Sequence, residues 1–218
     1  MPLDPSAAAF SADERHPALL RELAMLGDLR LYRKGTIVIA EGDVGDTMFI
    51  ILTGQVKSYS LDENDKQLTY GVFSAGEYFG EMALDGEARS SSVITVTATT
   101  CAVINRARLL AFIAMRPEFA LQLLNKLIRR LRATTLNAKN LAFIDVYGRL
   151  TACLYELAQL QPDGSQRIEE RITHQEIASR IGSGREMVSR IMKDLERGGY
   201  LRKHEKRIEL MKKLPLRW

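Results

Sequence analysis

The chain has 218 residues, 46% of them hydrophobic and 27% charged, with a formal net charge of +4. This length allows one large domain or two modest ones, and the apolar fraction is typical of a globular protein. Two cysteines, Cys101 and Cys153, are too few for a disulfide scaffold, a four-cysteine iron–sulfur cluster or a cysteine-built zinc site. No stretch approaches the roughly 20 apolar residues of a membrane span, and residues 1–15 lack the pattern of a signal peptide, so we expect a cytoplasmic protein.

The positive charge is unevenly distributed. Residues 1–144 hold 16 basic and 16 acidic side chains, so the whole excess of positive charge lies in residues 145–218. This asymmetry indicates a polyanionic partner for the C-terminal segment. The alternative is a solvated surface that carries a few extra lysines.

The first half of the chain reads as a short helical region followed by strands. Residues 1–14 are small and polar and predict a loose terminus, whereas the leucines of residues 15–26 recur at helical spacing. Beyond residue 28, short β-branched or aromatic runs alternate with glycine-bearing turns, which is typical of an antiparallel sandwich or barrel. The predicted strands are residues 36–39, 48–52, 55–60, 68–73, 93–97 and 101–104.

Two helices are predicted next, a short one over residues 108–115 and a long one over about 117–143, for which Pro117 suits the first turn. Apolar residues recur along the long helix in steps of three and four for about three heptads, which favours a coiled-coil dimer. The alternative is a helix packed on its own sheet. The stripe consists of Leu124, Leu127, Leu131, Thr134, Ala138 and Leu141.

The C-terminal pattern predicts a helix-turn-helix followed by a wing. We expect a helix over 146–161, a strand over 167–172, helices over 175–181 and 185–197, and a hairpin of 201–203 with 207–210. Thr173 and Glu176 have the spacing of a capping box, and Gly182 suits the turn. The alternative is a small helical domain whose arginines are merely solvated. The predicted inner face is Ile177, Ala178, Ile181, Met187, Val188, Ile191, Met192 and Leu195.

The second helix of this pair has the chemistry of a DNA reader. Arg185 and Arg190 can each pair with guanine, and Glu186 can accept from cytosine. Ser189 can bond to a base or a phosphate. Further phosphate contacts are expected from Thr173, Gln175 and Lys193, and from a wing that carries Lys203, Lys206 and Arg207. The outward positions are Arg185, Glu186, Ser189, Arg190 and Lys193.

A second constellation lies in the β-rich part, where residues 76–84 contain Gly80, Glu81 and Met82 and precede Arg89 and Ser90. A glycine-bearing turn offers backbone N–H groups to an anion. Arg89 can pair with a phosphate through two parallel bonds, and an ionised Glu81 can accept from a ribose hydroxyl. The alternative is a sheet corner closed by a structural Glu81–Arg89 salt bridge.

Residues 29–210 resemble the Crp/Fnr family of bacterial transcription regulators, most specifically at residues 79–81 with 89–90, 140–146 and 184–190. The resemblance implies an α+β fold with an N-terminal cyclic-nucleotide-binding β-roll that is jelly-roll-like, a long dimerisation helix and a C-terminal winged helix-turn-helix. It places a sensor domain with its dimerisation helix in residues 1–144 and the DNA-binding domain in residues 145–218.

The resemblance also implies residue roles. Gly80, Glu81, Arg89 and Ser90 would hold the ribose and cyclic phosphate, and Thr134 and Thr135 would meet the base, one of them from the partner subunit. Arg185, Glu186 and Arg190 would read a TGTGA-like half-site. Three features depart from this pattern: the segment between Glu81 and Arg89 is short, Ser91 stands where a cAMP-binding member of the family has alanine, and Ser189 precedes Arg190 as in the Fnr branch.

These observations predict a homodimeric regulator that binds a palindromic operator, contacts RNA polymerase and responds to cAMP. The alternatives are the same fold responding to cyclic di-GMP, a regulator that binds DNA without ligand, and a nucleotide-sensing module that acts on a protein partner. We expect no enzyme, because no nucleophile–base constellation stands out. We also expect no metal, since His16, His174 and His204 lack metal-site spacing.

Overall fold

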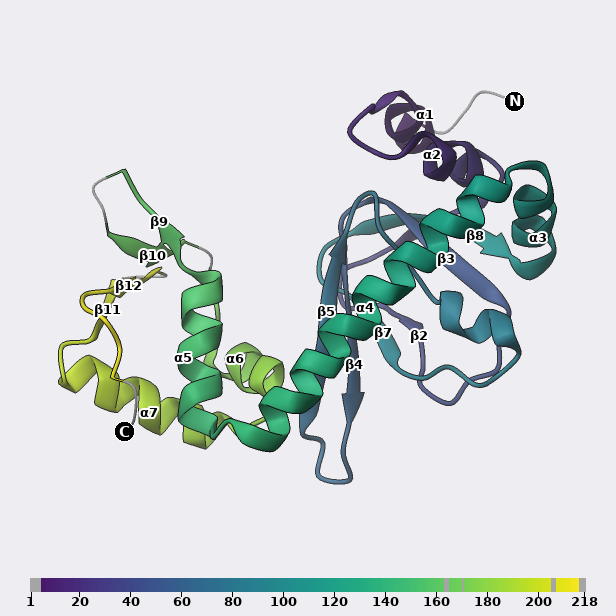
Figure 1. Cartoon of the computed structure of the whole chain (residues 1–218). Helices are drawn as coiled ribbons and strands as arrows, with labels where there is room; N and C mark the ends of the chain where they lie inside the picture. Colours follow the sequence, from purple (N-terminus) through teal and green to yellow (C-terminus); the bar gives the residue numbers. More distant parts are fainter. Residues whose placement is uncertain (1–4, 163–164, 170, 205–206, 216–218) are drawn as a thin grey trace. The chain divides into compact units, whose positions relative to one another are not determined.

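The computed structural model describes residues 5–162, 165–169, 171–204 and 207–215, and the chain folds as two compact units. The first unit comprises residues 1–60 and 69–131, and the second comprises residues 61–68 and 132–218. The long helix α4 (Pro117–Phe143) contributes to both (Figure 1). Among the described residues, no helix has the length and apolar character needed to cross a membrane. The expected α+β class is confirmed; the expected domain boundary after residue 144 stays a prediction.

Two four-stranded sheets form the β-roll of the first unit, and every described strand pair in them is antiparallel. One sheet has the order β1-β8-β3-β6 and the other β2-β7-β4-β5. The strands of the first sheet are β1 (Asp28–Tyr32), β8 (Thr99–Asn105), β3 (Thr47–Thr53) and β6 (Tyr78–Phe79). Those of the second are β2 (Ile37–Ile39), β7 (Ser92–Thr95), β4 (Gln55–Leu61) and β5 (Gln67–Ser74).

Strand β3 is buried on both faces because the sheet lies between two hydrophobic clusters. Phe49 and Ile51 point into the roll, where they pack with residues of both sheets. Met48, Ile50 and Leu52 point to the opposite side, as the two-residue period of a strand requires, and pack against helices. Those helices are α1 (Pro5–Ala12), α2 (Ala18–Met25), α3 (Arg106–Met115) and the start of α4.

The prediction of a loose terminus over residues 1–14 is wrong for the described part, since residues 5–12 form α1. Phe10 of this helix is 4% exposed and stacks on His16 with ring centroids 4.6 Å apart. The small residues around Phe10 gave no amphipathic pattern, but two buried side chains, Ala7 and Phe10, attach the helix to the cluster above β3. Residues 1–4 lie outside the described part. Strand β1 was also not predicted.

The second unit contains a winged helix-turn-helix. One hydrophobic cluster joins α5 (Val146–Leu157), α6 (His174–Ile181) and α7 (Arg185–Arg197) to a sheet of order β11-β12-β10-β9 (Figure 1). These strands are β9 (Gln159–Leu160), β10 (Gln166–Ile168), β11 (Leu201–His204) and β12 (Arg207–Leu210). The predicted helix over 146–161 therefore ends earlier, at Leu157, and the predicted strand over 167–172 ends at Ile168.

Sequence signals at the start and end of α6 are confirmed. Thr173 accepts from the backbone N–H of Glu176, and Glu176 accepts from the backbone N–H of Thr173, which completes the capping box. Gly182 ends the helix in the left-handed region with φ of 62°, where glycine is favoured. The prediction that Met187 faces the core is wrong, because it is 37% exposed. The other predicted inner residues of α6 and α7 lie in the core cluster.

Candidate functional site

Gly80 follows β6 and sets the geometry of the predicted effector cassette, which we define as residues 80–82 with Arg89 and Ser90. Its φ of +82° lies in the region that favours glycine. A Cβ atom added here would lie 3.0 Å from the Thr47 carbonyl oxygen and 3.0 Å from Nη1 of Arg89. The bare backbone at Gly80 therefore lets the Arg89 side chain approach closely.

Arg89 is 8% exposed and donates to three protein acceptors. Nη1 donates to the Gly80 carbonyl at 2.6 Å, while Nη2 donates to the carbonyl and hydroxyl oxygens of Thr47 at 2.9 and 3.1 Å. Burial lowers the pKa of Arg89, while the carboxylates of Asp46, Glu81 and Asp43 oppose that shift. The guanidinium is thus a buried positive group that is hydrogen-bonded to Gly80 of the cassette and to Thr47 of β3.

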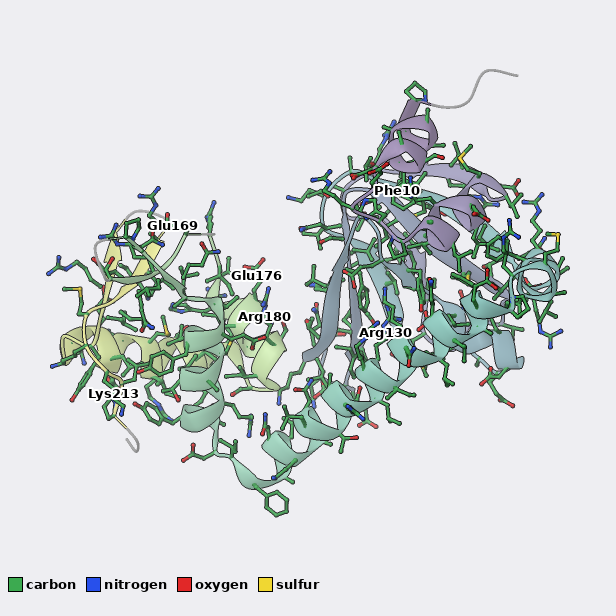
Figure 2. All side chains as sticks on the ribbon, turned by 45° about the horizontal axis from the view of Figure 1, so that its top comes forward. Phe10, Arg130, Glu169, Glu176, Arg180 and Lys213 are labelled. Atoms are coloured by element: carbon green, nitrogen blue, oxygen red, sulfur yellow. The ribbon has the colours of Figure 1, made fainter. Side chains whose placement is uncertain are left out.

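Glu81 pairs with Arg130 of α4 rather than forming the salt bridge to Arg89 that the sequence left open. Glu81 is 6% exposed, and Nη1 of Arg130 donates to its carboxylate. Nη2 of Arg130 donates to the Tyr78 carbonyl at 2.5 Å, and its guanidinium lies 4.6 Å from the Phe73 ring centroid. Figure 2 labels Arg130 on the helix beside the roll.

Sequence reasoning missed Arg130 as a site residue. Helical periodicity describes the long helix alone and indicates no partner for Arg130 on a strand-turn segment about 50 residues earlier in the chain. The available signal is its place one turn before Thr134, on the same helix as the expected base contacts. Its neighbour Lys126 also faces the roll, with Nζ 4.1 Å from the Tyr78 ring centroid and 3.8 Å from Glu77.

The remaining predicted effector residues divide into two groups. Met82 and Ser90 lie together in the first unit, where the Ser90 hydroxyl contacts the Met82 sulfur at 3.5 Å and Met82 is 61% exposed. Thr134 and Thr135 are exposed on the part of α4 that belongs to the second unit. The structure thus brings five of the seven residues together, and the roles of all seven stay predictions.

The predicted DNA-reading residues lie on one face of α7. Arg185, Glu186, Arg190 and Lys193 are exposed, while Ser189 is half-buried at the edge of this face. Thr173 and Gln175 lie at the start of α6. The Thr173 hydroxyl donates its one proton to Glu176 at 2.8 Å, so a phosphate contact from this hydroxyl requires that bond to break.

A pocket of about 460 Å³ lies between the start of α6, the start of α7 and the wing. Four basic side chains line it, Arg171, Arg185, Lys203 and Arg207, and none of its described lining residues is acidic. Such a positively charged concavity suits an anion such as a phosphate. Lys206, the remaining predicted wing residue, lies outside the described part of the chain.

Comparison with known proteins connects both sites to one family. The chain matches the cyclic nucleotide-binding domain over residues 29–116 and the Crp-like helix-turn-helix domain over residues 148–216. It is 35% identical to the CRP-like cAMP-activated global transcriptional regulator of Mycobacterium tuberculosis over 175 residues. This aligned region covers 78% of each chain. The chain belongs to the Crp/Fnr family of transcription regulators.

Other relatives of this Crp/Fnr regulator agree. The cAMP-activated global transcriptional regulator CRP of Salmonella typhimurium is 33% identical over 182 residues, which is 81% of this chain and 86% of the relative. Among solved structures, the c-di-GMP responsive global regulator CLP of Xanthomonas campestris has a TM-score of 0.77 at 28% identity, covering 89% of this chain and 99% of that one. The expected resemblance, fold and regulator class are therefore confirmed, and the relatives are regulators rather than enzymes.

Proposed function

We propose that this regulator is a homodimer whose sequence-specific binding to palindromic DNA is controlled by cAMP. The observation that carries the proposal is the Glu81–Arg130 ion pair, because it joins the effector cassette to the helix expected to dimerise. A ligand that engages Glu81 changes a direct contact of α4. Such a differential contact is what a ligand needs in order to shift a conformational equilibrium.

The cassette has the chemistry that a cyclic nucleotide requires. The Glu81 carboxylate can accept from the ribose 2′-hydroxyl, and the Arg89 guanidinium can pair with the cyclic phosphate. Both groups already have protein partners, so the nucleotide must share or replace bonds to Arg130 and Thr47. The same ligand would be bordered by Gly80, Met82 and Ser90. Its nucleobase would be contacted by Thr134 and Thr135.

Two kinds of relative bear on the effector. The curated relatives are named as cAMP-activated, which supports cAMP, whereas the solved neighbour at 28% identity is named as c-di-GMP responsive. A titration with cAMP, cGMP and cyclic di-GMP therefore decides the effector. Tight binding of cyclic di-GMP alone would replace cAMP in the proposal, and no binding at all would favour a regulator that needs no ligand.

An exposed apolar row on α4 supports the dimer. Leu121, Leu124, Ile128 and Leu131 follow steps of three and four, and they are 64%, 52%, 39% and 66% exposed in the single chain. A contiguous apolar row at this spacing is typical of a helix–helix interface. We call this exposed row the proposed seam of the dimer. It differs from the predicted stripe at Leu127, which is half-buried. A second copy of α4 would cover this row.

In the dimer, the two copies of α7 would enter successive major grooves about 34 Å apart, which is the spacing of a palindromic site. We place the functional boundary at Ile144 and Asp145, where α4 has ended and Asp145 caps α5 by accepting from Gly148. Binding to chromosomal DNA supports a cytoplasmic location, and action at promoters supports a contact with RNA polymerase.

The experiment that tests the DNA function uses Arg185→Ala and Arg190→Ala. Gel-shift titrations on a palindrome with TGTGA-like half-sites should show both variants losing selective binding. If both bind this DNA as tightly as the unmodified protein, α7 is not the reader. The module would then act on a protein partner instead.

A further inference from the structure

His174 links the recognition helix to the wing. It is the first residue of α6, and its Nδ1 lies 2.8 Å from the Ser189 hydroxyl on α7. Its Nε2 lies 3.0 Å from Nζ of Lys203 on β11. We call Lys203, His174 and Ser189 the relay. All three residues belong to the second unit, so the relay is a feature of the DNA-binding domain itself.

The chemistry of lysine sets the direction of every hydrogen bond in the relay. An ammonium group has three donors and no acceptor, so Nε2 of His174 must accept from Lys203. A neutral imidazole that accepts at Nε2 carries its proton on Nδ1, which then donates to Ser189. The Ser189 oxygen is thereby an acceptor toward His174. Its own hydroxyl proton remains for a partner on the other side.

The charges around His174 favour the neutral ring that this arrangement needs. Burial is the largest influence and lowers the pKa of His174, and the positive charges of Lys203 and Arg185 lower it further. Glu196 on α7 opposes them, while Arg171 and Arg207 add positive charge along the adjoining pocket. A protonated ring would also donate from Nδ1. Ser189 therefore faces an N–H donor in both protonation states while Lys203 is present.

We propose that the relay presets Ser189 as a hydrogen-bond donor to DNA and so determines the base preference at the position that Ser189 faces. Ser189 lies one helical turn from both Arg185 and Lys193 on α7, at the edge of the exposed face. A serine free to rotate can serve as donor or acceptor toward any base. A preset donor favours an acceptor edge, thymine O4 or guanine O6, over the amino group of cytosine. The inference rests on the proposed DNA-binding function.

The test selects binding sites from a library of palindromic DNA in which each half-site position is randomised in turn. The unmodified protein should disfavour cytosine by about fivefold at one position, the effect expected of one net hydrogen bond. Ser189→Ala should lose this preference and no other. His174→Phe removes both ring nitrogens at similar size and should lose the same preference, with its fold checked by thermal unfolding.

Three further variants separate the polarity of the relay from charge and shape. His174→Gln keeps one acceptor for Lys203 and one donor for Ser189, so it should keep the preference. Lys203→Met frees His174 to adopt the other tautomer, in which Nδ1 accepts and the hydroxyl proton is consumed. This variant should lose the preference at neutral pH and regain it once the pH is low enough to protonate the ring, because a protonated ring must donate from Nδ1. Lys213→Met removes one charge from the exposed tail of the same unit and should keep it.

The outcomes distinguish the inference from the function on which it rests. If the unmodified protein selects no sequence, the DNA-binding function fails and the relay fails with it. If it selects a site but His174→Phe gives the same profile at every position, the relay has no part in readout. If Ser189→Ala instead weakens binding to all sequences equally, Ser189 contacts a phosphate rather than a base, and the proposal is overturned.

Discussion

Arg130 of α4 donates a hydrogen bond to the Glu81 carboxylate, which is 6% exposed, and thereby connects the effector cassette to the long helix. A buried carboxylate that loses its partner keeps the cost of desolvation without the compensating attraction. The pair is therefore a point at which a ligand, the roll and the helix compete for the same oxygen atoms.

Removal of Arg130 should destabilise the first unit. Arg130→Met leaves Glu81 buried without its ion pair, and we expect a loss of about 2–3 kcal/mol in the free energy of unfolding. The measurement is urea denaturation, with Arg129→Met as the control for an exposed neighbour. The double variant Arg130→Met with Glu81→Gln should lose less unfolding free energy than the sum of the losses in the two single variants. Strict additivity would show that the two side chains do not interact.

Gly80 should tolerate alanine less well than Gly35. Both have φ near +80°, but a Cβ at Gly80 would lie 3.0 Å from the Thr47 carbonyl and from Arg89, whereas nothing lies within 4 Å of one at Gly35. Backbone strain alone costs on the order of 1 kcal/mol, so Gly35→Ala should show about that loss and Gly80→Ala a larger one. Gly80→Ala should also weaken nucleotide binding in calorimetry. Equal losses of stability would argue against the close packing of Arg89 at this turn.

Arg89→Ala should abolish the nucleotide response while the protein stays folded but less stable. The truncation removes the proposed phosphate partner and leaves the Gly80 and Thr47 oxygens without their donor, a cost of about 1–3 kcal/mol. Calorimetry with cAMP measures binding, and a thermal scan measures stability. A surviving ligand response would show that the cassette is wrongly assigned.

The exposed row on α4 should control the oligomeric state. Leu131→Glu places a charge in the proposed seam, where Leu131 is 66% exposed in the single chain, and should convert dimers to monomers in sedimentation equilibrium. Leu160 on β9 is 73% exposed and supplies the matched control. Leu160→Glu should leave the dimer intact. If Leu131→Glu remains dimeric at the same concentration, the seam lies elsewhere.

His174 predicts a direction for the pH dependence of stability. Its pKa is lowered in the folded protein, so the unfolded chain binds more protons as pH falls below about 6.5. The free energy of unfolding therefore decreases as pH falls from 7.5 to 5.5. Denaturation at both values should show a larger drop for the unmodified protein than for His174→Gln. Identical drops would place the titration elsewhere.

Local sequence signals predicted the helix-turn-helix well because its determinants are close together in the chain. Thr173 with Glu176, and Gly182 after Ile181, act within one turn of the helix that they delimit. The strands β3 and β8 were recognisable because two-sided burial keeps their central residues apolar, at positions 48–52 and 101–104. Helix α1 was missed because its stability comes from Phe10 packing on distant residues rather than from its own pattern.

The site could be predicted only in part, for the same physical reason. Glu81 and Arg89 were found because they lie within one turn segment and have the chemistry of ribose and phosphate recognition. Arg130 and the relay were not found, because their partners come together only in the folded chain. The direction of the His174 hydrogen bonds in particular depends on Lys203, 29 residues away.

A cyclic nucleotide in the Glu81–Arg89 cassette should control DNA binding through α4. The deciding measurement is fluorescence anisotropy of a labelled palindrome with TGTGA-like half-sites, recorded with no nucleotide and with cAMP, cGMP or cyclic di-GMP. We expect cAMP to lower the Kd for this DNA at least tenfold in the unmodified protein and to leave the Kd of Arg89→Ala unchanged. A Kd that is the same with and without each nucleotide would contradict the claim, because a ligand that binds two states equally shifts neither.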